Sequence, residues 1–380
     1  MKKFAAILLT VLLLAAMIPF SAITAFAATA DNVQFYRRNE ATNNLEPDTR
    51  NGCVVADETL SDIGVGYADW VIVNDNVQIV GLNVYGEANI ILAEGGELAM
   101  EYICGCGDAN VLHIYGTSAD GKGGTLRLNG EDSDAVFGVN IDLCGGSLIV
   151  EEGYENGISG EEQEIAVHGG SMSIQAGAAG VSGSFRITGG SAEITAKDNY
   201  STAQGIIGDL IMEGGELKIT ASFAGINGNA AVYGGELYIL AGDEGIYNGV
   251  LTFDDNIGSI HIAVNTSKMP GSGSDDALVC REIAGNHDNV ILFKGSGEWE
   301  SVGTFKDNPR TSLDEFNEVL LLPAGSENPS FSPDFAGSTL SSGNVTIICA
   351  VAVAAVGAFA AAYFVAKKKK QPALADDSED

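Results

Sequence analysis

Short alternations of apolar and polar residues recur along this chain, each at the same distance from a Gly-Gly pair. In the repeats from residue 123 onward, the second and fourth residues after each pair are apolar, and those between them are mostly polar. These apolar positions form two rows: Leu126, Leu148, Met172, Ala192, Leu217 and Leu237, then Leu128, Val150, Ile174, Ile194, Ile219 and Ile239. A second alternation precedes each pair, and a third is centred on a Gly-Ile or Gly-Val step. Because a period of two is typical of β-strands, we expect three short strands in each repeat.

The repeat length indicates how these strands are arranged. From residue 123 onward the Gly-Gly pairs recur every 20–25 residues, a period typical of solenoids. We therefore expect an all-β fold, a single-stranded right-handed parallel β-helix, in which each strand pairs with its equivalent one coil away at ~4.8 Å. Strands and not helices follow the Gly-Gly pairs, which argues against a phosphate-binding loop. The β-helix is expected at residues 67–264, an N-terminal cap at 28–66, and irregular final coils with a C-terminal cap at 265–322.

Both ends of the chain carry apolar runs outside this repeat. Residues 1–27 combine a basic start, an apolar run and an Ala-Phe-Ala site, which is typical of a secretory signal peptide. Residues 345–366 are uncharged and long enough to cross a bilayer as one transmembrane helix. Residues 367–380 begin with four lysines, which the positive-inside rule keeps in the cytoplasm, and residues 323–344 form a Ser-, Gly- and Pro-rich linker. We therefore expect a single-pass cell-membrane protein with an extracellular N-terminal domain and a cytoplasmic tail.

The charge balance restricts the partners. The chain has 19 Lys and Arg residues against 51 Asp and Glu residues, a formal net charge of −32 at pH 7. Such a surface repels nucleic acid and other polyanions, so nucleic acid is excluded as a partner. The same charge favours solubility, Ca²⁺ association or neutral ligands.

Cysteine and histidine give no recognisable metal-site or disulfide pattern. The expected extracellular part has five cysteines: Cys53, Cys104, Cys106, Cys144 and Cys280. An odd number at scattered spacing does not make a disulfide framework, and their disulfide state stays open. Cys104 and Cys106 share one face of a strand, so we expect them to pack as small apolar residues. The histidines lack metal-ligand spacing and are expected to be surface or packing residues: His113, His168, His261 and His287.

The residue directly after each Gly-Gly pair is expected to point outward and to form a ladder along the axis. Its members are Glu97, Thr125, Ser147, Ser171, Ser191, Glu216 and Glu236. Stacked serines have a structural role, but Glu216 and Glu236 would lie on adjacent coils, where like charges repel. With Glu213 nearby, a bridging Ca²⁺ would relieve this repulsion, because Ca²⁺ prefers carboxylate oxygens. We hypothesise a calcium site formed by Glu213, Glu216 and Glu236.

A second outward row lies two residues further along each strand. Its members are Arg127, Ile149, Ser173, Glu193, Lys218 and Tyr238. An aromatic ring flanked by polar groups suits the apolar face of a sugar, and Tyr233 adds a second ring near the corner. We therefore predict a carbohydrate-binding site formed by Tyr233, Tyr238, Lys218 and Glu193. The alternative, that these tyrosines simply pack on turns, stays open.

The repeats also resemble a known group of proteins. The relevant segments are Trp-Val-Ile-Val-Asn from residue 70, Val-Gln-Ile-Val-Gly-Leu-Asn-Val from residue 77, Asn-Ile-Ile-Leu-Ala-Glu-Gly-Gly from residue 89, and Leu-His-Ile-Tyr-Gly-Thr from residue 112. Together with the Gly-Gly repeats, over about residues 66–264, they resemble cell-surface β-helix proteins of Gram-positive bacteria. That group is similar in fold to pectate lyases and to carbohydrate-binding β-helix domains. The resemblance implies the fold more strongly than any activity.

Three functions are compatible with this pattern. Lyases of this fold use an Arg or Lys base beside Ca²⁺, and hydrolases use neighbouring Asp residues. The solenoid has few cations, and Arg127 and Lys218 lie four coils apart, so we name no catalytic residue and favour a non-enzyme. The favoured function is a surface protein that binds carbohydrate or another cell-surface polymer and mediates adhesion. The alternatives are a polysaccharide lyase or hydrolase, and a structural stalk or interaction domain without a glycan site.

Overall fold

The computed structural model describes residues 28–107, 109–130, 134–151, 154–198 and 202–264, followed by the separate segments 278–279, 282–284, 290–295, 299–304, 318–323 and 326. Every regular element in these residues is a β-strand. Within them, no helix is long and apolar enough to cross a membrane. The chain divides into two compact units, Met1–Asn328 and Pro329–Asp380, and the second unit lies outside the described residues. The expected signal peptide and the apolar run at 345–366 also lie outside them.

The first sixteen strands fall into two groups, the N-terminal strands and the strands of the early coils. The N-terminal strands are β1 (Thr29–Ala30), β2 (Val33–Arg38) and β3 (Leu45–Arg50). The early coils contain β4 (Cys53–Val55), β5 (Asp62–Gly64), β6 (Trp70–Val73), β7 (Asn76–Gln78), β8 (Gly81–Tyr85), β9 (Glu87–Leu92), β10 (Glu97–Met100), β11 (Tyr102–Gly105), β12 (Val111–Gly116), β13 (Thr125–Leu128), β14 (Asp134–Phe137), β15 (Asn140–Leu143) and β16 (Ser147–Val150).

The later strands are longer, and several of them run around a corner of the coil. They are β17 (Asn156–Val167), β18 (Ser171–Ala176), β19 (Ala179–Ile187), β20 (Ser191–Ala196), β21 (Gln204–Ile207), β22 (Leu210–Ala221), β23 (Ala224–Asn227), β24 (Ala230–Ala241), β25 (Glu244–Tyr247), β26 (Val250–Phe253), β27 (Ser259–Val264), β28 (Leu278–Val279) and β29 (Glu282–Ala284). The last strands are β30 (Val290–Gly295), β31 (Trp299–Thr304) and β32 (Glu318–Pro323).

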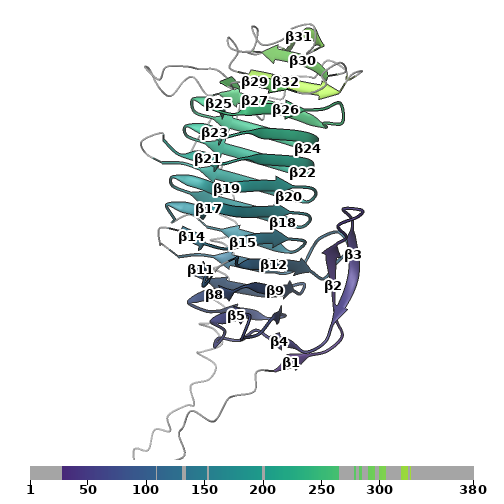
Figure 1. Cartoon of the computed structure of the whole chain (residues 1–380), viewed down its shortest axis with the longest axis vertical. Helices are drawn as coiled ribbons and strands as arrows, with labels where there is room; N and C mark the ends of the chain where they lie inside the picture. The colour runs from purple at the N-terminus through teal and green to yellow at the C-terminus, as the bar shows by residue number, and fades with distance from the viewer. Residues whose placement is uncertain are drawn as a thin grey trace, which may run out of the picture. The chain divides into compact units, whose positions relative to one another are not determined.

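These strands stack into a parallel β-solenoid of the right-handed type with about nine turns, which confirms the expected solenoid (Figure 1). Each coil contributes to three faces. The post-glycine face follows the Gly-Gly corners and includes β10, β13, β16, β18, β20, β27 and the second halves of β22 and β24. The middle face includes β8, β11, β14, β21, β23 and β25. The pre-glycine face includes β6, β9, β12, β15 and the second halves of β17 and β19.

The apolar rows predicted from the sequence line the interior. Leu217 pairs in register with Ala192 on one side and Leu237 on the other, and the row continues the same way along the stack. All twelve predicted members are buried, with exposed fractions of 3% or less. The interior faces of consecutive coils therefore form one continuous apolar core, which supplies most of the stability of a solenoid.

Glycine at the corners is required by backbone geometry. Gly215 has φ of 75°, a left-handed conformation that costs a residue with a β-carbon, and a β-carbon there would lie 2.8 Å from the carbonyl oxygen of Gly190. The corners of neighbouring coils are in direct contact for this reason. This explains why the Gly-Gly pairs recur with the coil.

Parallel pairing also occurs on both sides of residues 67–264, and on the C-terminal side it falls where irregular final coils are expected. Parallel pairing begins with β4 and β5, which lie inside the segment expected to form the N-terminal cap, and continues into β28 and β29. At the C-terminal side, β32 pairs antiparallel with β27 and with β30, so β32 covers the last edge of the post-glycine face. Covering this edge removes a row of free backbone groups that would otherwise promote aggregation.

The N-terminal hairpin formed by β2 and β3 does not belong to any coil. It packs on the outside of the pre-glycine face (Figure 1). There, Val33 and Phe35 form a small apolar cluster with Ile72, Ile91 and Tyr115. Its only backbone pairing with the coils, among the described residues, joins Tyr36 of β2 to Gly116 of β12. The hairpin is therefore held to the solenoid mainly by side chains.

The four described cysteines are free. Cys53 and Cys144 are buried, and Cys104 and Cys106 are half-buried on the middle face. Burial raises the pKa of the Cys53 and Cys104 thiols, which keeps both protonated and unreactive at neutral pH. Cys280 lies outside the described residues.

Candidate functional site

The outward row predicted on the post-glycine face is present in the structure. The paired residues are Arg127, Ile149, Ser173, Glu193, Lys218 and Tyr238, and His261 of β27 extends the row by one coil. Parallel pairing in register places such side chains ~4.8 Å apart along the axis. The row, and not only its individual members, was predicted correctly from the alignment on Gly-Gly.

Lys218 and Tyr238 form the centre of a polar and aromatic patch at the C-terminal part of this row. The Lys218 ammonium lies 5.8 Å from the centroid of the Tyr238 ring and 2.6 Å from Oε1 of Glu216. The hydrogen bond to Glu216 raises the pKa of Lys218, so this side chain stays charged. The Tyr238 hydroxyl donates to Oε2 of Glu236 at 2.8 Å. The patch therefore holds its aromatic ring between fixed charged groups.

His261 closes the patch at its C-terminal end. Its ring meets Tyr238 edge to face, with centroids 6.3 Å apart, and its Nε2 lies 3.0 Å from Oε1 of Glu318 in β32. His261 is buried, so the strand that covers the solenoid edge also orients the last aromatic neighbour of Tyr238. The sequence placed His261 only among surface or packing residues, because Glu318 lies outside the regular repeat.

The structure brings some of the predicted ligand-binding residues together and separates another. Glu193 pairs in register with Lys218, and its charge contributes to the raised pKa of that lysine. Tyr233 is 42% exposed but lies before Gly234, on the other side of the corner from Tyr238. Glu193, Lys218 and Tyr238 therefore share one face, and Tyr233 does not share it.

The three carboxylates suggested for calcium have separate partners. Glu216 and Glu236 lie in register on adjacent coils, as expected, but Glu216 binds Lys218 and Glu236 accepts from Tyr238. Glu213 lies 3.1 Å from the Arg186 guanidinium. In the part of the chain that the structure describes, no group of three or more His, Cys, Asp or Glu side chains is arranged to hold a metal ion. Calcium binding by these three residues stays a prediction.

Arg127 is one of the few cations of the solenoid. Its guanidinium lies 3.1 Å from Glu97 and 2.7 Å from Glu151, each one coil away. Burial lowers the pKa of Arg127, but the two carboxylates outweigh this effect and raise the pKa overall. The side chain is therefore held protonated between two ion pairs, an arrangement that bridges three coils and does not favour proton abstraction.

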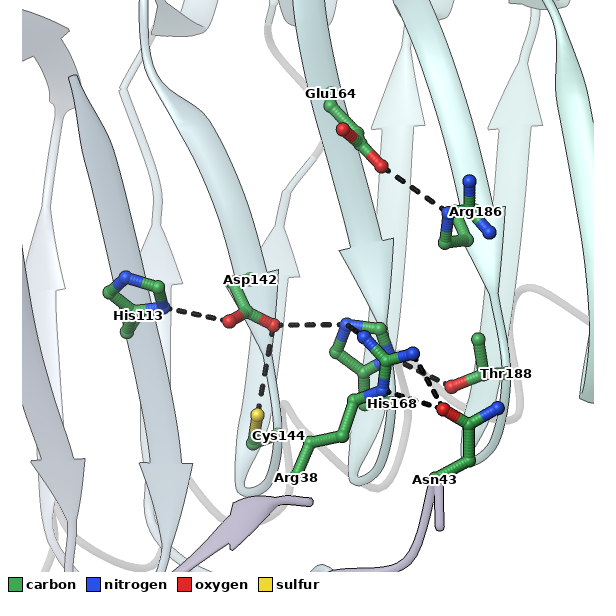
Figure 2. Close-up of polar contacts among 9 residues, drawn as sticks. All are labelled: Arg38, Asn43, His113, Asp142, Cys144, Glu164, His168, Arg186 and Thr188. Atoms are coloured by element: carbon green, nitrogen blue, oxygen red, sulfur yellow. Dashed lines mark hydrogen bonds and ion pairs between the residues drawn. The ribbon is translucent and has the colours of Figure 1, made fainter. Parts of the chain in front are cut away.

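A second polar group lies on the pre-glycine face, and the sequence analysis did not identify it. His113 of β12, Asp142 of β15 and His168, directly after β17, lie on three successive coils (Figure 2). Asp142 accepts from Nδ1 of His113 at 2.7 Å and lies 3.3 Å from Nε2 of His168. We call these three residues the histidine cluster. Their spacing in the sequence resembles no metal motif. Aligning the apolar neighbours, such as Leu112 with Ile141, would have predicted that His113 and Asp142 are adjacent.

The histidine cluster is tied to the surrounding elements. Nδ1 of His168 lies 2.7 Å from the Thr188 hydroxyl, and Nε2 lies 3.4 Å from Nη1 of Arg38, which comes from the hairpin (Figure 2). Nε2 of His113 lies 3.7 Å from Glu87. His168 is only 7% exposed, and its ring contacts Arg38 of the hairpin.

The two histidines respond to these surroundings in opposite directions. Burial lowers the pKa of His113, but the hydrogen bond to Asp142 and the charges of Asp142 and Glu87 outweigh it, and the pKa is raised. Burial lowers the pKa of His168, and the negative charge of Asp142 opposes this effect. The positive charge of Arg38 lowers the pKa as well, so the net shift is downward. Neutral pH therefore favours the neutral form of His168.

Cys144 lies beside the histidine cluster but does not make it a nucleophilic site. Its Sγ lies 3.7 Å from Oδ1 of Asp142. Burial, together with the charge of Asp142, raises the pKa of the Cys144 thiol to about 12. Because the thiolate is the reactive form, this cysteine is inert at neutral pH as long as it stays buried.

A pocket of about 230 Å³ lies at the N-terminal end of the solenoid, far along the axis from the Lys218–Tyr238 patch. Its lining includes Val54, Asp57, Leu60 and Tyr67. It contains neither predicted site.

Comparison with known proteins adds no functional assignment. No protein-family model matches the chain, and searches of curated proteins and of solved structures find no significant match. The resemblance to cell-surface and pectate-lyase-like β-helix proteins is therefore supported at the level of the parallel β-solenoid alone.

Proposed function

We propose that this protein is a non-catalytic surface protein whose solenoid binds a neutral carbohydrate polymer along the post-glycine face. The observation that carries the proposal is the Lys218–Tyr238 patch, in which an aromatic ring lies between charged groups on consecutive coils. A ring of this kind offers an apolar surface for the C–H face of a sugar, and the carboxylates of Glu216 and Glu236 accept hydrogen bonds from sugar hydroxyls.

The repeat supports an elongated ligand in preference to a small one. A polymer lying along the axis meets a new outward side chain every ~4.8 Å, so several weak contacts add along its length. The net charge of −32 favours a neutral polymer over an anionic one. The resemblance to carbohydrate-binding β-helix domains agrees with this ligand class.

The proposed location follows from the ends of the sequence. The apolar run at 345–366, followed by lysines, would anchor the protein in the cell membrane as a single-pass segment. The solenoid would then lie outside the cell, where polysaccharides are accessible. Adhesion to another cell that displays the same polymer is part of this proposal.

The test is incubation of the purified full-length chain, in detergent, with a panel of neutral and anionic polysaccharides. We expect retention of a neutral polymer without cleavage. For Tyr238→Leu we expect at least a tenfold loss of affinity, which corresponds to about 1.4 kcal/mol of binding free energy. Tyr67→Leu is the matched control, because Tyr67 is 53% exposed but lies on the loop between β5 and β6.

Other outcomes separate the alternative functions. Shortened or unsaturated products would show a polysaccharide hydrolase or lyase. Absence of both retention and cleavage across the panel would favour a structural stalk or interaction domain. Equal binding by Tyr238→Leu and the unsubstituted protein would place the glycan site elsewhere on the molecule.

A further inference from the structure

The hairpin β2–β3 is attached to the solenoid by two sets of side chains. Near its base, Phe35 lies 5.2 Å from the ring of Trp70 and 4.9 Å from that of Tyr115, and the Arg50 guanidinium lies 4.9 Å from the Trp70 ring. Trp70 and Tyr115 are themselves stacked at 5.7 Å. The hairpin therefore covers an aromatic surface that belongs to the coils.

Near its turn, the charged side chain of Arg38 contacts the coils, in addition to the apolar contact of Leu45 with the cluster that contains Cys144. Nε and Nη2 of Arg38 donate to Oδ1 of Asn43 at 3.0 and 2.6 Å, so the hairpin itself fixes the direction of the guanidinium. The remaining nitrogen, Nη1, lies 3.4 Å from Nε2 of His168 (Figure 2). The guanidinium of an arginine can only donate, so this contact requires a lone pair on Nε2.

Nε2 of His168 therefore has two possible partners that need different proton positions on the ring. Contact with Arg38 needs the neutral ring, with the proton on Nδ1 donated to Thr188 at 2.7 Å. Contact with Asp142, at 3.3 Å, is favourable only when Nε2 carries a proton. Protonation thus turns an acceptor for the hairpin into a donor for the coil and places two cations face to face.

We propose that the β2–β3 hairpin is an acid-released strap, which His168 holds against the coils through Arg38 when neutral and releases when protonated. Release uncovers the Trp70–Tyr115 aromatic surface and the histidine cluster. The proposal is independent of glycan binding on the post-glycine face, which is a different face of the solenoid.

The other charged groups around His168 belong to the coils and remain in both states. They are Asp142, Arg186 and Glu164, and Arg186 is paired with Glu164 at 3.3 Å and with Glu213 at 3.1 Å. His113 keeps its contacts with Asp142 and Glu87 in both states, because all three are coil residues. On the hairpin, Arg37 pairs with Asp48 at 3.1 Å and not with the histidine cluster. Among the charged groups around His168, only Arg38 leaves on release.

The direction of the pH effect follows from this difference. In the closed state, burial is the main cause that lowers the pKa of His168. The positive charge of Arg38 lowers this pKa further. In the released state the pKa returns toward the ordinary value of about 6.5. The closed strap is therefore fully stabilised above about pH 6.5 and is progressively lost as the pH falls below it. The equilibrium constant for hairpin opening increases by at most about tenfold for each unit by which the closed state lowers the pKa of His168.

The experiment is hydrogen exchange of the full-length chain, read by mass spectrometry at about pH 8 and about pH 5 and corrected for intrinsic exchange rates. We expect the amides of Val33–Arg38 to exchange severalfold faster at acid pH, while those of Ser191–Ala196 in β20 keep their protection. His168→Gln, which accepts from Arg38 but cannot be protonated, should abolish the acid effect. His113→Gln is the matched control, because it also contacts Asp142 but not the hairpin, and should retain the effect.

A second readout uses a thiol of the protein itself. Cys144 is 2% exposed and belongs to the apolar cluster under the hairpin. Arg38→Met, which removes the donor, should increase modification of Cys144 relative to the unsubstituted protein at the same neutral pH. The proposal is overturned if hairpin protection does not depend on pH, if His168→Gln keeps the full acid effect, or if β20 opens together with the hairpin. If His168→Gln does not fold, unchanged Cys144 modification in Arg38→Met overturns it alone.

Discussion

Single residues determine how closely the coils can approach one another. On the middle face, Gly157, Gly180, Gly205, Gly225 and Gly245 occupy equivalent positions, each directly before an inward Ile or Val. A β-carbon on Gly205 would clash with Cγ2 of Ile219 and lie 2.5 Å from the carbonyl oxygen of Gly225. The requirement at these positions is therefore space and not only backbone freedom.

Substitution at Gly205 tests this requirement. We expect Gly205→Ala to destabilise the protein by about 1–3 kcal/mol, because the methyl group meets a packed core residue and a fixed carbonyl. The measurement is the midpoint of urea unfolding. Gly177→Ala is the control, since its β-carbon would meet Tyr154 at an ordinary 3.4 Å. Equal midpoints for the two variants would show that the coils can separate to admit a methyl group.

At the scale of elements, each strand has one face in the core and one outward row. In β22, Leu217 and Ile219 are buried, while Lys218 between them has a side chain that is 54% exposed. This alternation places the patch on the outside because it places the aliphatic rows inside. A shift of one residue in register would exchange the two faces, which explains why the apolar rows fix the outward rows as well.

The inward assignment of Ile219 gives a prediction for a whole strand. Ile219→Asp places a carboxylate among Ile194, Ile239 and other apolar side chains, so we expect a loss of more than about 4 kcal/mol and loss of the array. Thermal unfolding, monitored by circular dichroism, measures this loss of stability. Lys218→Gln, at the neighbouring outward position, should leave the melting temperature nearly unchanged. An unaltered melting temperature for Ile219→Asp would contradict the core assignment.

At the scale of the whole solenoid, stability is shared between neighbouring coils. Each coil contacts mainly the coils before and after it, so the free energy of unfolding is approximately a sum over coils and their interfaces. The structure shows equivalent residues in register, for example Glu216 with Glu236 and Leu217 with Leu237. One coil should therefore be removable without loss of the fold.

Deletion of Glu216–Gly235, which joins Gly215 to Glu236, removes one complete coil. We expect a folded β protein with a lower melting temperature, because one interface is lost while every remaining pair keeps its register. Deletion of Glu216–Gly225 removes about half a coil and moves strands onto the wrong faces, so we expect it not to fold. Circular dichroism and thermal unfolding compare the two variants. Similar behaviour of both would show that stability does not depend on coil register.

The sequence alone determined the parts of this protein that repeat. Period-two alternation and the recurrence of Gly-Gly predicted the solenoid, its apolar rows, and the row that joins Glu193, Lys218 and Tyr238, because in-register stacking converts sequence alignment directly into spatial contact. The tertiary structure decided what lies outside the repeat. The hairpin covers the pre-glycine face, β32 supplies Glu318 to His261, and Arg38 meets His168 across 130 positions of the chain. No local pattern encodes those contacts, since they depend on how non-repeating segments fold back onto the coils.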